Sequence, residues 1–464
     1  MNHHYEDSLM KLEGVAGPHT ISDIDIYMGS GILENAPAYI RKRDLGSSCL
    51  LIADDNTMKA AGAALEAALG AHGFTVRRCV LAHAARIEAD ERSSGDVLMA
   101  CEPEPDFLIA CGSGVINDVT RFIAHSIGKP FVSVGTAASM DGYISVIAPM
   151  IYRNKKVHRH GSAPRVLVLD TRILRAAPYE MIVAGFGDVL GKYIAKADWL
   201  LSRIVNGEAV DENAVGLITQ ALENLVSHVD DIKNLTEKGL AAVIEGLILA
   251  GITIFTIGHT RAVASVEHNQ GHIWETRMLE SGRPYALHGI SVGCSTGYYL
   301  RMYDYFRGLD IRALDRDAAR SAILDYEKIR QDALSCFGEE FLAVIEAENP
   351  VFRVTRSEFE RQYDALTTNW ERILRTLSFL PGWDDYRRLY AKLAYPIDAE
   401  AIGIPPELLT YTLRYAHLYR DRYSVVDALH ILGAAHMAAD GTLADYRKLR
   451  DGDSCAGNGS DGLL

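Results

Sequence analysis

Four side chains in the middle of the chain have the types and spacing of a metal site. Asp188 follows a glycine-rich helix start, and His288 begins a later helix. Between them, His268 and His272 lie four residues apart on a helical pattern, which places both rings on one face. One carboxylate and two imidazoles with an open position are typical of a catalytic divalent cation such as zinc. Spacing alone leaves both His268 and His272 as candidate ligands, and each residue taken singly also fits a helix cap or a core histidine.

A glycine turn earlier in the chain is a candidate site for an anion. Phe107–Ala110 is a short apolar strand pattern, and Gly112-Ser113-Gly114 lets the backbone turn without interference from a Cβ. Val115–Ile127 then reads as a helix whose first N–H groups favour an anion such as a nucleotide pyrophosphate. The turn is an incomplete dinucleotide fingerprint, because Asn117 occupies the third glycine position.

Alternating strands and helices must position this turn. We expect strands at residues 24–28, 49–53, 74–80, 107–110, 131–134, 146–151 and 165–170, the first of them at a sheet edge. This alternation predicts a parallel sheet with helices on both faces, with ligands beyond the carboxyl ends of the strands. Asp54 directly follows such an end, where it could bind an adenosine ribose, although Asp54 or Asp55 could equally cap the next helix. The basic run 153–163 is expected to be a solvated hairpin tip.

The pattern changes after Pro178 to long helical periods. We expect helices at residues 181–206, 210–231, 237–258, 261–280, 288–306, 315–347, 356–379, 384–394, 406–420 and 424–438. The predicted domains are an α/β domain (1–175), an all-helical domain (176–450) and a disordered tail (451–464). The apolar run 239–258 is long enough to span a membrane, but Glu245 lies inside it and no basic flank frames it, which favours a buried core helix.

Composition excludes several classes of partner. The chain has 464 residues and a formal net charge of −14, which argues against nucleic acid or an anionic membrane as the main partner. Its seven cysteines contain no CxxC pair, so reduced thiols in a cytoplasmic protein are expected. The N-terminus shows no apolar stretch of a secretory signal.

Five motifs occur in the order found in a known family. They are GSGVINDVTRF, VGTAASMDGYIS, GFGDVLGKYIAKADW, EHNQGHIWE and LHGISVG, spread over about residues 20–300. In these motifs the chain resembles the bacterial sn-glycerol-1-phosphate dehydrogenases, in the superfamily of glycerol dehydrogenase, iron-containing alcohol dehydrogenase and dehydroquinate synthase. The resemblance implies a dehydroquinate synthase-like fold: an N-terminal α/β domain with a parallel Rossmann-like sheet, followed by an all-α C-terminal domain. It also implies hydride transfer between NAD(P)H and C2 of dihydroxyacetone phosphate, a role in phospholipid biosynthesis, and a homodimer or larger homo-oligomer.

The resemblance assigns roles to individual residues. It implies that the dinucleotide binds Asp54, Gly114, Val115, Ile116, Asn117, Asp118, Thr136, Ala137, Ala138, Ser139 and Ser145. One divalent metal (zinc, nickel or iron) would be held by Asp188, His268 and His288, while His272 would contact the substrate with Asp141 and Asp188. Asp188 and His272 would thus be catalytic. NAD(H) is favoured over NADP(H), because the charge of Asp54 would repel a 2′-phosphate.

Three departures from the family pattern bear on the substrate. Ile290 stands where relatives often have an acidic residue, Gly271 replaces a usual Ser or Ala, and the region from about residue 305 is longer than expected. A dehydrogenase of an unphosphorylated polyol such as glycerol is the first alternative, and a dehydroquinate synthase-like cyclase is a second. A non-enzymatic binding protein is disfavoured, because all three metal-ligand positions are filled. The candidate cations for a substrate phosphate are Lys192, Arg261, Arg277 and Arg283.

Overall fold

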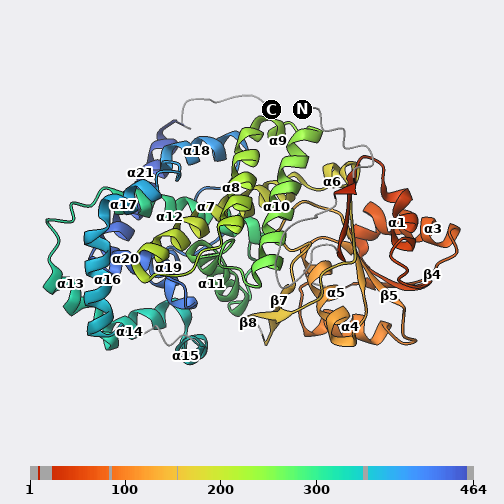
Figure 1. Cartoon of the computed structure of the whole chain (residues 1–464), viewed down its shortest axis with the longest axis horizontal. Coiled ribbons are helices and arrows are strands. Elements are labelled where there is room, and N and C mark those ends of the chain that lie inside the picture. The colour runs from red at the N-terminus through yellow and green to blue at the C-terminus, as the bar shows by residue number, and fades with distance from the viewer. Residues whose placement is uncertain (1–8, 11–22, 83–85, 154, 349–353, 457–464) are drawn as a thin grey trace. The chain divides into compact units, whose positions relative to one another are not determined.

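The computed structural model describes residues 9–10, 23–82, 86–153, 155–348 and 354–456. The chain forms two compact units (Figure 1). Unit 1 comprises residues 1–190, 211–263 and 287–290, and unit 2 comprises residues 191–210, 264–286 and 291–464. We expected a boundary at residue 175, where strands give way to helices. The helical region is instead divided between the two units, because residues 211–263 belong to unit 1. Helices α7 (Tyr179–Asn206) and α12 (His288–Arg307) each contribute residues to both units.

Unit 1 is built on a seven-stranded sheet with the order β1-β2-β9-β6-β5-β3-β4. Its strands are β1 (Leu9–Met10), β2 (Asp25–Gly29), β3 (Ser48–Asp54), β4 (Thr75–Leu81), β5 (Phe107–Gly112), β6 (Phe131–Gly135) and β9 (Val166–Asp170). All neighbours pair in parallel except β1 and β2, so the predicted parallel sheet is confirmed. The strand expected at the edge, β2, has the two-residue β1 beyond it.

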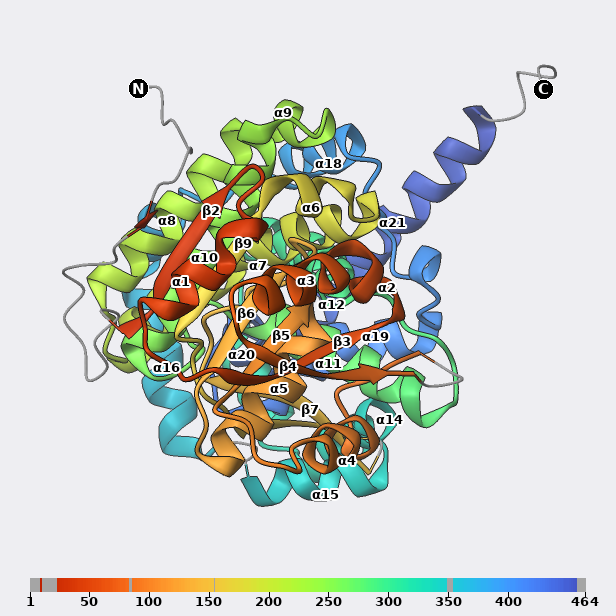
Figure 2. The same cartoon turned by 90° about the vertical axis from the view of Figure 1, so that its right-hand side faces the viewer.

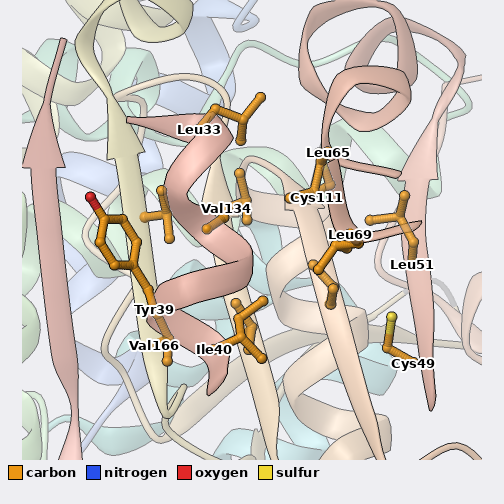
Figure 3. Close-up of a cluster of buried hydrophobic side chains, with 14 of the residues drawn as sticks. Leu33, Tyr39, Ile40, Cys49, Leu51, Leu65, Leu69, Cys111, Val134 and Val166 are labelled. Carbon is orange, nitrogen blue, oxygen red and sulfur yellow. The ribbon is translucent and has the colours of Figure 1, made fainter. Parts of the chain in front are cut away.

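Both faces of this sheet are covered, as strands with continuous apolar sequence require. On β3, Cys49 and Leu51 point into a cluster with Ile40 and Leu69 of helices α1 (Ala36–Arg41) and α3 (Ala63–Ala71) (Figure 3). The alternate residues of β3, such as Leu50, point into a second cluster with helices α4 (Glu91–Ala100) and α5 (Gly114–Ile127). Figure 2 shows α3 and α5 on opposite sides of the sheet.

The hairpin after the sixth strand differs from the prediction. β7 (Ile147–Tyr152) pairs antiparallel with β8 (Lys155–His160) in a separate two-stranded sheet and does not join the large one. The basic run is therefore a strand over Lys155–His160 rather than a loop. Ala148 and Met150 of β7 are buried in the same cluster as α5.

Unit 1 also contains a helical part. Its remaining helices are α2 (Asp55–Thr57), α6 (Thr171–Ala176), the first turns of α7, α8 (Glu212–Ser227), α9 (Val229–Lys233) and α10 (Glu237–Ile257). α10 is long and apolar enough to cross a membrane, but 89% of its most apolar window is buried inside the protein. Glu245 within it accepts a hydrogen bond of 2.8 Å from Asn224 Nδ2. The expected core helix is confirmed.

Unit 2 is helical throughout its described residues. Its helices after α7 are α11 (Val266–Glu280), α12, α13 (Arg316–Ile323), α14 (Tyr326–Phe337), α15 (Glu339–Glu348), α16 (Arg356–Thr368), α17 (Trp370–Thr376), α18 (Trp383–Lys392), α19 (Pro406–Tyr415), α20 (Val425–Ile431) and α21 (Ala435–Ala456). The single helix expected over 315–347 is three, because Asp325 caps α14 and Gly338, at φ +75°, follows it. α21 continues to Ala456, into the expected tail, and residues 457–464 lie outside the described chain.

Candidate functional site

The glycine turn at the end of β5 is held rigid by Asn117. The Asn117 side chain is fully buried, and its Nδ2 donates to the carbonyl oxygens of Gly112 and Ser113 at 3.3 and 3.0 Å. Its Oδ1 accepts a hydrogen bond of 2.6 Å from Ser133 Oγ on the neighbouring strand β6. Asn117 was expected to touch the dinucleotide, but its side-chain amide hydrogen-bonds within the protein and shapes the turn.

The small-residue loop after β6 lies beside this turn. The sheet register pairs Gly112 with Gly135, and the N–H of Thr136 donates to the carbonyl of Gly112 at 3.2 Å. The hydroxyls of Ser113 and Ser139 lie 2.6 Å apart, which joins the two loops. Thr136, Ala137, Ala138 and Ser139 are all buried. The turn Gly112–Gly114 and the loop Thr136–Ser139 together form what we call the nucleotide floor. These two segments are neighbours, as the parallel sheet required.

Arg121 is a site residue that the sequence reasoning missed. It is fully buried on α5, and its Nη1 donates to the carbonyls of Ser145 and Ile147 at 2.9 and 3.1 Å, while Nη2 donates to Gly142. It therefore anchors the segment that follows Asp141. Ser145, expected to touch the cofactor, uses its hydroxyl in a local turn with the backbone of Ile147, at 3.0 Å.

Asp118 lies next to Arg121 on α5, and their Oδ1 and Nε are 3.8 Å apart. Burial raises the pKa of Asp118 to about 6, although Arg121, Lys156 and His288 oppose the shift. Its Oδ1 is buried without a hydrogen-bond partner among the described residues. Asp118, which was expected to touch the dinucleotide, therefore has one carboxylate oxygen that lacks a hydrogen bond.

Asp54 caps the helix that follows β3. Its Oδ1 accepts from the N–H of Thr57 at 2.8 Å, and Thr57 Oγ1 accepts from the N–H of Asp54 at 2.9 Å, which completes a capping box. Of the two roles left open, the cap is therefore occupied by Asp54 itself. Ile52 is paired with Ala110 in the sheet, so Asp54, two residues on, is level with Gly112 at the carboxyl edge.

Helix α7 approaches the small-residue loop through a glycine. A Cβ on Gly185 would overlap the carbonyl group of Ala138, so only glycine allows this approach. One turn later on α7, Asp188 is fully buried, and its Oδ2 accepts a hydrogen bond of 3.1 Å from the N–H of Asp141. The structure thus brings together Asp141 and Asp188, two of the predicted substrate residues.

His288 reaches α7 by the same means. A Cβ on Gly289 would overlap the carbonyl group of Ala184, so the start of α12 lies directly against α7. A ring nitrogen of His288 and a carboxylate oxygen of Asp188 lie within 4.8 Å of each other. Two of the three expected metal ligands are therefore close together in unit 1.

In unit 2, His268 is oriented by a carboxylate. Its Nδ1 lies 2.7 Å from Oε1 of Glu267, and both residues are buried. The same Oε1 accepts from the N–H of Ser265 at 3.0 Å. The imidazole lies against α7, since a Cβ built on Gly191 would be 3.4 Å from Cε1 of His268. Gly191 follows Asp188 by three residues on one continuous helix.

His272 is paired with a second carboxylate. Its Nδ1 lies 3.4 Å from Oε2 of Glu275, and both side chains are buried. The rings of His268 and His272 have centroids 6.3 Å apart, and the ring of Tyr419 is 6.2 Å from that of His272. The helical spacing correctly placed the two histidines on one face of α11.

The four candidate phosphate cations lie in different surroundings. Arg277 Nη1 donates to Glu280 at 2.7 Å, and Arg283 is exposed. Lys192 and Arg261 are buried.

Known proteins are similar to this chain in sequence. The family model described as iron-containing alcohol dehydrogenase matches residues 27–178. A glycerol-1-phosphate dehydrogenase (NAD(P)+) of Bacillus subtilis (strain 168) is 35% identical over 58% of this chain and 69% of its own length. One of Bacillus velezensis is 31% identical over 86% of this chain and 89% of its own.

The fold agrees with these relatives. The crystal structure of a probable glycerol dehydrogenase from Sinorhizobium meliloti 1021 superposes with a TM-score of 0.60 at 17% identity, covering 91% of this chain and 97% of that one. The order of elements, a parallel α/β sheet followed by helices, is thus that of a known enzyme fold. Together with the identity to the Bacillus proteins, it shows that this chain belongs to the glycerol-1-phosphate dehydrogenase family.

Proposed function

We propose that this protein is a metal-dependent oxidoreductase that interconverts dihydroxyacetone phosphate and sn-glycerol 1-phosphate, with hydride transfer between C2 and C4 of a nicotinamide. The relatives named above supply the substrate class. The observation that carries the proposal is the hydrogen bond from the N–H of Asp141 to Asp188. It joins the loop of the nucleotide floor to a candidate metal ligand, as a reaction between cofactor and metal-held substrate requires.

Asp188, His268 and His288 are proposed to hold one divalent cation. The proximity of Asp188 and His288 supports this, and so does the contact of His268 with the next turn of α7. The donor set fits such an ion: one carboxylate and two imidazoles, one of them oriented by a buried carboxylate. A bound cation would supply Lewis acidity toward the C2 oxygen of the substrate.

The protein's own residues would then position the reactants. The first N–H groups of α5 have no acceptor within a helix and favour the pyrophosphate. Gly114 supports this role, because a Cβ there would meet Met140 only at an ordinary 3.5 Å. Packing therefore does not require glycine at this position, whereas close approach of a ligand would. The Asp54 cap engages Oδ1, which leaves Oδ2 for a ribose hydroxyl. His272, held by Glu275, would bind a substrate oxygen or relay its proton.

Substrate choice separates this proposal from its alternatives. NADH oxidation should be fast with dihydroxyacetone phosphate and slow with unphosphorylated dihydroxyacetone. Equal rates would favour a polyol dehydrogenase such as one acting on glycerol. Release of inorganic phosphate from a seven-carbon sugar phosphate, without net oxidation of NADH, would favour the cyclase.

Metal dependence is tested by chelation. Activity should be lost after treatment with a chelator and return with added zinc, nickel or iron. Activity indifferent to the chelator would remove the metal from the mechanism. A protein that binds NADH but turns over no ketone in any metal form would be the non-enzymatic alternative.

We further propose a preference for NAD(H) over NADP(H), a cytoplasmic location and a homodimer or larger homo-oligomer. Six of the seven cysteines are buried and form no disulfide, which fits a reducing compartment. A role in the synthesis of phospholipids would follow from the proposed product. Light scattering of the purified protein would determine the number of subunits.

A further inference from the structure

Helix α11 carries two pairs of one glutamate and one histidine with different geometry. In the first, Glu267 Oε1 lies 2.7 Å from His268 Nδ1, and in the second Glu275 Oε2 lies 3.4 Å from His272 Nδ1. Only the first distance is that of a strong, charge-assisted hydrogen bond. The two pairs therefore act differently on their imidazoles.

Glu267 is itself fixed from two sides. Its side chain is fully buried, and the N–H of Ser265 donates to the same Oε1 at 3.0 Å. The Ser265 hydroxyl donates to Asp198 at 2.6 Å, and Asp198 also accepts from Tyr303 at 2.6 Å. A chain of buried hydrogen bonds thus runs from α7 and α12 to the oxygen that faces His268.

The second oxygen of Glu267 is the unexplained feature. Oε2 is buried and has no hydrogen-bond partner among the described residues. A buried carboxylate that lacks part of its hydrogen bonding is costly unless positive charge lies nearby. A divalent cation on the other side of the imidazole would supply that charge.

We infer that Glu267 is a positioning residue for the metal. Its carboxylate fixes the Nδ1–H tautomer of His268, so that Nε2 carries the lone pair for the ion, and its charge makes this nitrogen a stronger donor. The inference rests on the proposed function, because it takes His268 as a metal ligand. Glu275 makes a longer contact, and to His272 rather than to His268, so it does not fix this tautomer.

The test measures metal affinity without turnover. Apo-protein is titrated with Zn²⁺ in competition with a chromophoric chelator, and with Co²⁺, whose visible spectrum reports the ligand field. Glu267→Gln keeps the size of the side chain and should bind Zn²⁺ about 10- to 100-fold more weakly, with an altered Co²⁺ spectrum. Glu280→Gln, the same substitution at the exposed end of the same helix, is the control and should bind both ions like the wild type.

The outcomes separate this inference from the proposed function. If the wild type binds no Zn²⁺, or Asp188→Asn binds it as tightly as the wild type, the metal site itself is wrong. If Asp188→Asn weakens binding but Glu267→Gln does not, only the role of Glu267 fails. Equal losses in Glu267→Gln and Glu280→Gln, or a loss in Glu280→Gln alone, would also overturn it.

A folding defect is controlled separately. Circular dichroism of the metal-free variants should match that of the wild type. Should Glu267→Gln fail to fold, Glu267→Asp retains the charge but shortens the side chain by one methylene, so it cannot keep the 2.7 Å contact to Nδ1. It should also bind Zn²⁺ more weakly than the wild type, and wild-type affinity in this variant would contradict the inference.

Discussion

The carbonyl group of Ala138 lies directly against the backbone of Gly185, with no room for a side chain between them. Through this contact the loop Thr136–Ser139 packs against α7 one turn before Asp188. The bond from the N–H of Asp141 to Asp188 follows from it. A single glycine therefore controls the distance between the proposed cofactor floor and the proposed metal.

Gly185→Ala should break this contact. Alanine is favoured over glycine in a helix by about 1 kcal/mol, but overpacking of a close contact costs typically about 1–3 kcal/mol. We expect lower stability to urea together with weaker binding of NADH and Zn²⁺.

Gly271→Ala is the control for this substitution. A Cβ there would meet Val292 Cγ2 at an ordinary 3.6 Å. The higher helix propensity of alanine should therefore stabilise the protein by roughly 0.5–1 kcal/mol, and the affinity for NADH should not change. If both substitutions to alanine stabilise the protein and leave its affinities for NADH and Zn²⁺ unchanged, the role given to Gly185 is wrong.

Gly114→Ala should separate ligand binding from folding. A Cβ on Gly114 would have ordinary contact with Met140, so thermal stability should stay near that of the wild type. The methyl group would stand where the pyrophosphate is proposed to approach, and the dissociation constant for NADH, measured by fluorescence quenching, should rise at least about tenfold, or roughly 1.4 kcal/mol. Unchanged affinity would move the pyrophosphate away from this turn.

Asp54→Asn should relax the choice of cofactor. Asparagine remains a good N-cap, so the capping of α2 and the stability should persist. Loss of the negative charge should raise kcat/KM for NADPH relative to NADH. Asp55→Asn, one residue later, is the control and should leave the ratio as it is. A ratio that responds equally to both substitutions would reflect net charge rather than the ribose contact.

The two candidate sites were predictable to different extents. His268 and His272 lie on the helical face that their spacing predicts, and His288 begins α12 as expected. Asp188 was expected at a helix start, but it lies inside α7, because the helix begins at Tyr179 and continues through Gly185 and Gly187. The role of Arg121 was not predictable, because its three acceptors are carbonyls of a segment more than twenty residues away. Asn117 shows the reverse case: a polar residue in a binding motif is used for the turn itself. The breaks at Asp325 and Gly338 did carry a sequence signal, a cap residue and a glycine, that helical periodicity concealed.

Acid should destabilise unit 2 through its buried histidines. Burial lowers the pKa of His417 from 6.5 to about 3, and its Nδ1 has no hydrogen-bond partner among the described residues. Between these pH values the unfolded chain takes up a proton that the folded protein does not. Stability contributed by the neutral ring is therefore complete above about pH 6.5 and falls as the pH drops toward 3, by up to about 1.4 kcal/mol per pH unit.

His417→Phe keeps a ring in this position and removes its titration. The free energy of unfolding of this variant should fall less steeply than that of the wild type between pH 6 and 4, and the two curves should run parallel above pH 7. Identical slopes in acid would show that His417 is protonated in the folded protein.

The central claim is that this protein reduces a phosphorylated ketone at a metal held by Asp188. The most direct measurement compares NADH oxidation by the zinc-loaded wild type and Asp188→Asn, with dihydroxyacetone phosphate and with dihydroxyacetone. We predict rapid oxidation only for the wild type with the phosphorylated ketone, and sn-glycerol 1-phosphate as its product. Equal rates with both ketones, or full activity in Asp188→Asn, would contradict the account.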